Sequence, residues 1–164
     1  MAKRRRKLRV MVDANVLYAG TLWRRWPYEV LRHALRRDFR LALSAQAIDE
    51  AREAIAEDAP TRSAKFERLL TLLDYELVAD PTPKQMAKYP NLVSDKDDLP
   101  IGVAAILAKV DNFVSEDKHF TEKNAGNTRF HQKVKVMRPV IFLREVMGWT
   151  SAELGQVQKR TETS

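Results

Sequence analysis

Short apolar runs alternate along the chain with longer amphipathic stretches. The runs are rich in β-branched and large apolar residues and end at polar ones, which is typical of buried strands. They cover residues 8–12, 41–43, 76–78, 112–115 and 134–137. Between and after them, apolar positions recur at helical spacing, or a proline or N-cap residue opens a helix. The predicted helices cover residues 26–35, 45–57, 62–74, 99–110 and 139–146, with a last polar helix from the capping box of Thr150 and Glu153.

The order of these elements predicts the fold class. Strands that alternate with helices favour a parallel sheet covered on both faces. Residues 99–110 are apolar on nearly every side, which indicates a buried helix rather than a surface one. We therefore predict an α/β fold, a three-layer α/β/α sandwich with a central, mainly parallel sheet.

Composition narrows the class of protein. The 164 residues suit one domain, and the absence of cysteine excludes disulfides, a thiol nucleophile and cysteine-based metal sites. No run reaches the roughly 18 apolar residues of a membrane span. The apolar stretch after the basic start is too short for a signal peptide, so we expect a cytoplasmic protein with no membrane association.

The net charge of +7 is concentrated at the start of the chain. Lys3, Arg4, Arg5, Arg6, Lys7 and Arg9 supply six positive charges within the first nine residues. We expect three parts: a basic arm at residues 1–7, a globular domain at residues 8–149 and a polar helix or tail at residues 150–164. The arm either binds an anionic partner or keeps the protein soluble.

Two acidic residues directly follow predicted strands, where an open parallel sheet binds its ligands. Asp13 ends the first strand, and Asp117 follows the strand at 112–115. The two side chains meet at one sheet edge if those strands are neighbours. Each also has a structural interpretation, because Asp13 can cap a helix or turn and Asp117 can cap a short helix.

Two further acids stand out by their surroundings. Glu50 lies on one side of its predicted helix with Ala47 and Ala54, whose small side chains let another element approach closely. Asp98 precedes the helix that contains Pro100, where an N-cap carboxylate is ordinary. Surface exposure and helix capping are therefore the alternatives to a functional role for these two residues.

A cluster of such acids would need a cation. Two unit charges 4 Å apart repel by about 4 kcal/mol at an effective dielectric of 20. Oxygen-only ligands select hard ions, so Mg²⁺ or Mn²⁺ is the natural occupant. The three histidines show no paired metal-ligand spacing.

Four stretches carry a resemblance to a known family. They read VMVDANVL at 10–17, LSAQAIDE at 43–50, KDDLPI at 96–101 and VDNFVSEDKHF at 110–120. In this order they resemble the PIN domain, the metal-dependent ribonuclease fold of VapC-type toxins and related RNA-processing nucleases. The resemblance implies a ribonuclease that hydrolyses RNA phosphodiester bonds with one or two Mg²⁺ or Mn²⁺ ions.

The resemblance also implies which residues form the site. Its four catalytic acids correspond to Asp13, Glu50, Asp98 and Asp117, of which Asp13, Asp98 and Asp117 bind metal and Glu50 is a ligand or orients one. Asn15 and Ser115 would be polar supports. The sequence departs from the family pattern at Glu116, where a glycine is usual. Asp95 and Asp97 compete with Asp98 for the third acidic position.

RNA binding would need positive charge around this site. We predict RNA contacts by six residues: Arg4, Arg5, Arg6, Arg24, Arg25 and Lys118. Basic residues also gather in residues 118–138, which is typical of a phosphate-binding surface or of solvated helix faces. Trp23 and Trp26 could stack on bases, although their spacing beside Leu22 favours core or dimer contacts.

Other functions remain open at the level of sequence. The main alternative is a non-catalytic basic module that binds RNA or DNA and uses its acids as caps. Within the enzyme interpretation, a toxin and a housekeeping RNA-processing nuclease share the same motifs. A toxin of this family implies a homodimer and a small antitoxin partner. A haloacid-dehalogenase-type site would need an Asp where this chain has Asn15.

Overall fold

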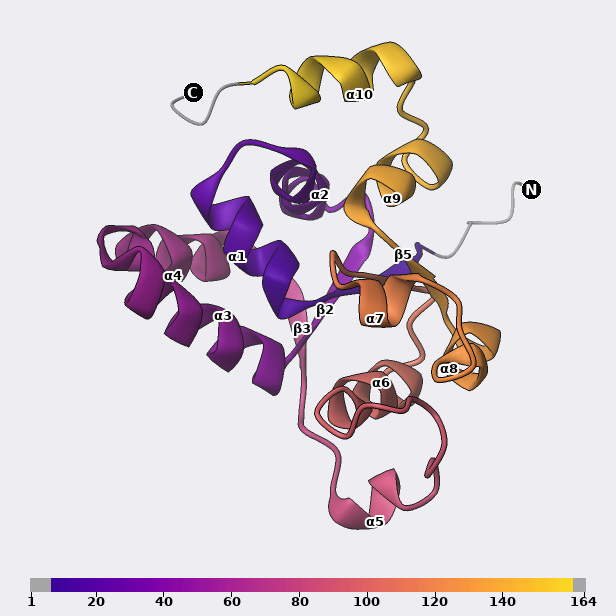
Figure 1. The fold of residues 1–164 in the computed structure, drawn as a ribbon. Helices are drawn as coiled ribbons and strands as arrows, with labels where there is room; N and C mark the ends of the chain where they lie inside the picture. Colours follow the sequence, from indigo (N-terminus) through magenta and orange to yellow (C-terminus); the bar gives the residue numbers. More distant parts are fainter. Residues whose placement is uncertain (1–6, 161–164) are drawn as a thin grey trace, which may run out of the picture.

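A five-stranded sheet with helices on both faces forms the centre of the molecule (Figure 1). The computed structural model describes residues 7–160. Its strands are β1 (Arg9–Val12), β2 (Arg40–Ser44), β3 (Tyr75–Val78), β4 (Asn112–Val114) and β5 (Lys135–Met137). Its α-helices are α1 (Ala14–Leu22), α2 (Trp26–Leu35), α3 (Ala45–Asp58), α4 (Ser63–Leu72), α5 (Pro83–Met86), α6 (Leu99–Leu107), α7 (Lys118–Thr121), α8 (Thr128–Lys133), α9 (Pro139–Glu145) and α10 (Ser151–Gln158). A 3₁₀ turn, Pro60–Arg62, precedes α4.

All neighbouring strands pair in parallel, in the order β3-β2-β1-β4-β5. β1 is therefore central, and Val10 pairs with Leu41 on one side and with Asn112 on the other. After β3 the chain crosses to the far side of β1, so the connections that leave β1 and β4 run in opposite directions. Such a switch point opens a crevice beyond the carboxyl ends of the two strands.

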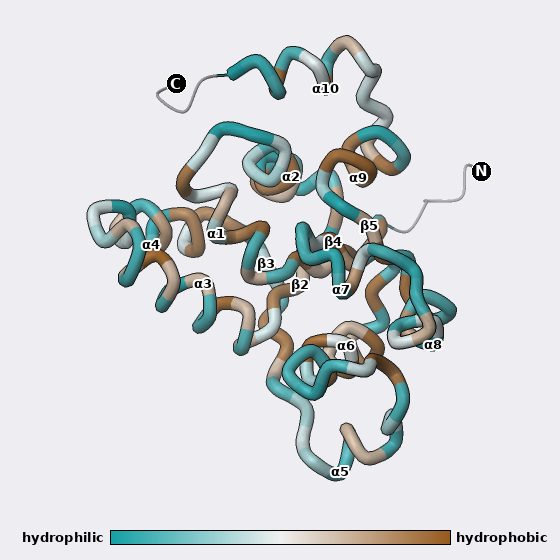
Figure 2. Tube along the Cα trace, in the orientation of Figure 1, coloured by the Kyte–Doolittle hydropathy of each residue, from teal (hydrophilic) through white to brown (hydrophobic). Residues whose placement is uncertain are grey.

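The two faces of the sheet build separate hydrophobic cores. Val10 and Val12 of β1 belong to the cluster under α1, α2, α3, α4 and α9, whereas Met11 between them belongs to the cluster with α6, Phe120 and Phe130. This alternation follows from the two-residue period of a strand. Apolar colour accordingly runs through the strands and the inner sides of the helices in Figure 2. The predicted three-layer α/β/α class is confirmed.

The predicted strands are all present, and each predicted helix is found with ends shifted by a few residues. Four helices, α1, α5, α7 and α8, lie outside the predicted ranges, although a short helix capped by Asp117 is one of the predicted alternatives. α1 escapes the periodicity because buried and half-buried residues occur on all its sides, and because Gly20 interrupts a helical pattern. Among the described residues no helix is long and apolar enough to cross a membrane.

Gly20 lets α1 and α2 pack closely. A Cβ at this position would stand 2.4 Å from Leu31 Cδ1 and 3.3 Å from the Pro27 carbonyl oxygen. Leu31 is itself fully buried, so the contact leaves little room for its side chain to move. The glycine is therefore required by the approach of the two helices.

The C-terminal helix α10 packs against α2 and α9. Its predicted capping box is confirmed, with Thr150 and Glu153 bonded to each other's backbone N–H. Contrary to the expectation of a polar helix, α10 buries Leu154 and Val157. Trp26 Nε1 donates to the Leu154 carbonyl oxygen at 3.2 Å.

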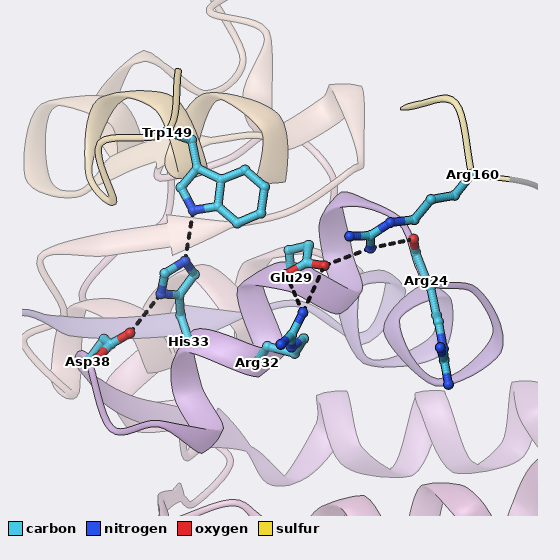
Figure 3. Close-up of polar contacts among 7 residues, drawn as sticks. All are labelled: Arg24, Glu29, Arg32, His33, Asp38, Trp149 and Arg160. Atoms are coloured by element: carbon cyan, nitrogen blue, oxygen red, sulfur yellow. Dashed lines mark hydrogen bonds and ion pairs between the residues drawn. The ribbon is translucent and has the colours of Figure 1, made fainter. Parts of the chain in front are cut away.

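Hydrogen bonds from Arg160 and Trp149 reinforce the attachment of the C-terminal segment to α2 and to the turn before it (Figure 3). Arg160 donates to the buried Glu29 carboxylate at 2.7 Å and to the Arg24 carbonyl oxygen at 3.1 Å. Trp149 Nε1 donates to His33 Nε2 at 2.9 Å. Because an indole nitrogen can only donate, His33 Nε2 must accept, and its Nδ1–H then donates to Asp38 at 2.7 Å.

Candidate active site

Asp13 stands at the end of the central strand β1 and is only 5% exposed. It is also the N-cap of α1, and its Oδ1 accepts from the Ala14 N–H at 2.8 Å. Its own N–H donates to the Val114 carbonyl oxygen of β4 at 3.0 Å, which joins the two strand ends. Asp13 thus both caps α1 and lies at the switch point of the sheet.

Ser115 and Asn15 fix the second oxygen of the Asp13 carboxylate. The Ser115 hydroxyl donates to Asp13 Oδ2 at 2.9 Å, and Asn15 Nδ2 lies 3.3 Å from the same oxygen. Ser115 Oγ in turn accepts from Asn15 Nδ2 at 3.1 Å and from the Asp117 N–H at 3.0 Å. Asn15 Oδ1 accepts from the Glu116 N–H at 3.0 Å. One hydrogen-bond network therefore connects the ends of β1 and β4.

Asp117 follows that network at the start of α7. Its Oδ1 accepts from the His119 N–H at 2.9 Å, so the residue caps the short helix as one interpretation predicts. The parallel pairing of β1 with β4 brings Asp13 and Asp117 to one sheet edge, as expected if the strands are neighbours.

Glu50 approaches the same edge from α3. Its carboxylate is exposed and accepts from Gln46 Nε2 at 2.7 Å. Ile48, Ala51 and Ile55 are buried, which confirms the predicted core face of this helix. Glu50, Ala51 and Ala54 all line the pocket described below.

Asp98 is placed at the start of α6 on the other side of the sheet edge. Although it occupies the N-cap position, its side chain makes no capping hydrogen bond. The capping interpretation therefore does not account for this residue. Of its competitors, Asp97 also faces the pocket, whereas Asp95 Oδ1 accepts from the Asp97 N–H at 2.9 Å within the preceding loop.

These acids line one pocket of about 440 Å³. The predicted residues in its wall are Asp13, Asn15, Glu50, Asp98 and Asp117, and further lining residues are Ala14, Tyr18, Ala51, Ala54, Asp58, Asp97 and Ile101. Tyr18 donates its hydroxyl to Asp58 at 3.0 Å across the pocket wall. We call this the acidic pocket.

Sequence reasoning missed Tyr18 and Asp58. Asp58 was detectable, because it lies eight residues after Glu50 on α3 with Ala54 halfway, so that the three share one side of the helix. Tyr18 could be found only once α1 was recognised as a helix, since it lies one turn beyond Asn15.

The acidic pocket disfavours its own negative charges. Burial raises the pKa of Asp13 to about 6 against the hydrogen bonds of Ser115 and Ala14, and the charges of Glu50 and Asp117 raise it further. Burial also raises the pKa of Asp98 to about 6, with contributions from Asp95, Asp117 and Asp13. Such mutual repulsion is the condition that a bound cation relieves.

The donor set fits a hard divalent cation in its chemistry. Every candidate ligand is a carboxylate oxygen, which is what Mg²⁺ and Mn²⁺ prefer. Within residues 7–160, however, no three His, Asp or Glu side chains converge closely enough to hold a metal ion. The acids thus share a pocket without forming a closed ligand set.

Glu116, the departure from the family pattern, does not enter the acidic pocket. Its carboxylate lies 3.7 Å from Arg138 Nη2 and is half-buried. It lines a separate pocket with Trp23, Arg25 and Arg138.

The structure describes only some of the predicted RNA-contact residues. Arg4, Arg5 and Arg6 lie outside the described residues. Lys118 is exposed at the start of α7, next to Asp117, and Arg24 and Arg25 are exposed in the turn between α1 and α2. Their contact with RNA stays a prediction.

The two tryptophans also differ. Trp26 is partly buried against the core, which confirms the core interpretation for this residue. Trp23 remains 37% exposed, so the core interpretation is wrong there, because α1 ends at Leu22 and the chain turns outward.

Comparisons with known proteins agree with this geometry. The family model of the PIN domain matches residues 9–119. A search of curated proteins gives no match. The fold is similar to the crystal structure of PAE2754 from Pyrobaculum aerophilum, with 16% identity, a TM-score of 0.58 and coverage of 87% of this chain and 97% of the other. It is also similar to VapBC2 from Rickettsia felis, solved bound to a DNA fragment from their promoter, with 15% identity, a TM-score of 0.55 and coverage of 80% and 98%.

Proposed function

This chain belongs to the PIN-domain family, whose members are generally nucleases that use divalent metal ions, and we propose that it is a Mg²⁺- or Mn²⁺-dependent ribonuclease. One observation carries the proposal: acids from four separate segments line a single pocket beyond the carboxyl ends of the central strands. The reaction is hydrolysis of an RNA phosphodiester bond.

In this proposal Asp13, Asp98 and Asp117 hold one or two cations, and Glu50 is a further ligand or orients one. When bound, the metal lowers the pKa of a water molecule and neutralises charge on the phosphate. Ser115 and Asn15 hold the Asp13 carboxylate in place through the hydrogen bonds described above. Asp13 Oδ1 accepts only the Ala14 N–H, so this oxygen keeps a lone pair for a cation.

A non-catalytic nucleic-acid-binding module is the competing function. It explains Asp13 and Asp117, which both cap helices. It leaves Asp98 unexplained, because burial and three neighbouring acids raise the pKa of a side chain that caps nothing. The arrangement of the acids therefore favours the enzyme.

The proposal is tested by RNA cleavage with purified full-length protein. Single-stranded RNAs of mixed sequence are incubated with Mn²⁺ or with EDTA, and the products are resolved on a denaturing gel. We expect cleavage only with the metal. Asp98→Asn and Asp13→Asn should each lower the rate by at least the ~100-fold that loss of a residue supporting a metal ligand can cost.

Two substitutions on α3 form a matched pair for the same assay. Glu50→Gln removes a carboxylate that lines the acidic pocket, whereas Glu53→Gln removes one that is exposed elsewhere on the helix. Only the first should reduce cleavage. Undiminished cleavage by Asp98→Asn would contradict the assigned site. RNA binding that changes neither with the metal nor in Asp13→Asn would favour the non-catalytic module.

The proposal concerns the chemistry of the site, which a toxin and an RNA-processing nuclease share. The likeness to VapBC2 supports the toxin as the more specific role. An antitoxin partner and a homodimer stay predictions of the family resemblance.

A further inference from the structure

A second pocket of about 360 Å³ lies beyond α1 from the acidic pocket. Its walls come from the end of α1, the turn into α2, the start of α2, the segments after β4 and β5, and the end of α10. The lining residues are Ala19, Trp23, Arg25, Trp26, Pro27, Glu116, Arg138, Val157 and Gln158. We call it the tryptophan pocket.

The tryptophan pocket adjoins the acidic pocket at two places. Glu116 precedes Asp117, and its N–H donates to Asn15 Oδ1 at 3.0 Å. On α1, Asn15 and Ala19 lie one turn apart on the same side of the helix, and Trp23 follows as the C-cap in extended backbone. The eight helical residues from Asn15 to Leu22 span about 12 Å, the length of about four nucleotides stacked about 3.4 Å apart. An RNA strand at the acids can therefore reach the tryptophan.

Trp23 offers an aromatic ring that the fold holds in place. Its ring centroid lies 5.9 Å from that of Tyr18, with the two planes at 76°. Tyr18 is itself fixed by its hydrogen bond to Asp58. The indole is 37% exposed, which leaves apolar surface for a planar ligand. Single-stranded RNA is recognised by stacking of unpaired bases on such rings.

Glu116 adds a hydrogen-bond acceptor beside that ring. The Arg138 guanidinium, 3.7 Å away, compensates its charge within the pocket wall. A carboxylate accepts hydrogen bonds and donates none, so it selects a base edge that presents N–H donors. Guanine presents two such donors side by side on its Watson–Crick edge, whereas uracil presents one donor between two carbonyl oxygens that a carboxylate repels.

We propose that the tryptophan pocket binds a guanine base of the RNA strand whose phosphate lies in the acidic pocket. Trp23 stacks on the base, and Glu116 accepts hydrogen bonds from its Watson–Crick edge. This inference rests on the proposed ribonuclease function and names the feature of the substrate that the site selects. It also gives a role to Glu116, the residue that departs from the family pattern.

The proposal explains what α10 contributes. This helix lies outside residues 9–119, which the family model matches, yet it supplies Val157 and Gln158 to the pocket wall. Trp26 of α2 holds the helix through the Leu154 carbonyl oxygen. Glu29 of α2 holds Arg160, which follows the helix (Figure 3). The C-terminal segment thus completes a base-binding site next to a core that is common to the family.

The test measures binding without cleavage, using full-length protein in EDTA. The probes are fluorescein-labelled hexauridylate and the three versions with one central guanosine, adenosine or cytidine, read by fluorescence anisotropy. We expect the guanosine probe to bind about tenfold more tightly than hexauridylate, within the range that stacking and hydrogen bonding of one base contribute.

Substitutions then separate stacking from base selection. Trp23→Ala should weaken binding of the guanosine probe about tenfold, and Trp23→Phe should restore most of it. Glu116→Gln should retain binding but abolish the preference for guanosine over adenosine. Glu122→Gln is the matched control, because this exposed glutamate lies outside both pockets and should leave every affinity unchanged.

Equal affinity for all four probes, or an unchanged guanosine preference in Glu116→Gln, would overturn the proposal. RNA affinity that is unchanged in Trp23→Ala would also overturn the proposal. The occupant of the tryptophan pocket would then be a protein side chain rather than a base. Because the assay needs no metal, a guanosine preference in a protein that fails to cleave RNA with Mn²⁺ supports the tryptophan pocket and refutes only the ribonuclease.

Discussion

At the scale of single residues, the acidic pocket places carboxyl groups where their charged form is disfavoured. Asp13 accepts three hydrogen bonds, yet its burial outweighs them, so its pKa is raised to about 6. Asp98 reaches the same value with much less burial because three neighbouring acids add to the effect. Both residues therefore change charge close to physiological pH.

This yields a prediction for the pH dependence of cleavage. A cation binds the deprotonated carboxylates, so Mn²⁺-dependent activity should be constant at alkaline pH and fall as the pH drops through about 6. Initial rates measured across this range at saturating RNA, with Mn²⁺ below its Kd, provide the test, because saturating metal would lower the apparent pKa of its own ligands. An activity that persists unchanged to a pH of about 4 would contradict the assignment of Asp13 and Asp98, because acids of ordinary pKa titrate there.

The sequence predicts individual site residues unevenly. Asp13 and Asp117 are predictable because each directly follows an apolar strand. The choice of Asp98 over Asp97 is not, since both line the pocket and their difference lies in burial. The orientation of Glu116 is equally hidden, because it depends on Arg138, which is distant in sequence.

At the scale of elements, α1 determines how the two pockets are arranged. Its first residues follow Asp13 in the acidic pocket, and the residue after its last turn lies in the tryptophan pocket. No amphipathic period marks this helix in the sequence because α2 and α3 both pack against it. Tertiary contacts thus form a helix that local pattern alone does not reveal.

Two glycines offer opposite predictions about helix packing. Gly20→Ala should lower the free energy of unfolding by about 1–3 kcal/mol, because the added methyl overlaps Leu31. Gly155→Ala in α10 should raise it by about 0.5–1 kcal/mol, because nothing lies within 4 Å of the new Cβ and alanine favours the helix. Urea unfolding of both variants measures the two values. Equal effects of the two substitutions would show that close packing of α1 on α2 is not required.

At the scale of the whole molecule, the acidic pocket lowers the stability of the fold when no metal is bound. The folded-state pKa of Asp13 and of Asp98 lies above the usual value of 3.8, so each group stabilises the fold relative to ordinary Asp only at low pH. That contribution is lost as the pH rises from about 4 to about 6. At neutral pH the ionised acids therefore destabilise the metal-free protein.

Thermal unfolding with and without Mn²⁺ should reveal this loss of stability. In EDTA at pH 8, Asp98→Asn should melt at a higher temperature than the wild type. Saturating Mn²⁺ should raise the wild-type melting temperature, by the equivalent of about 2.7 kcal/mol at 100 times Kd, and raise that of Asp98→Asn less. Asp49→Asn, an exposed acid of α3 outside the acidic pocket, is the control and should resemble the wild type. An equal response of all three proteins to Mn²⁺ would place the metal elsewhere.

The fold class is the part that the sequence predicts best, because the alternation of apolar strand runs with helices is visible along most of the chain. The order of the strands was not predictable, since nothing in the sequence of β1 states that β4 rather than β3 pairs beside it. That order decides the site, because it places Ser115 against Asp13.

The pairing of β1 with β4 also determines when, during synthesis of the chain, the site can form. Ser115 and Asp13 are 102 residues apart in the chain, yet they share a hydrogen bond. A growing polypeptide on the ribosome can form β1, β2 and β3 while Ser115 and Asp117 are not yet synthesised. On the proposed function, the nascent chain stays harmless to the messenger RNA that encodes it until the segment with Ser115 and Asp117 has been translated.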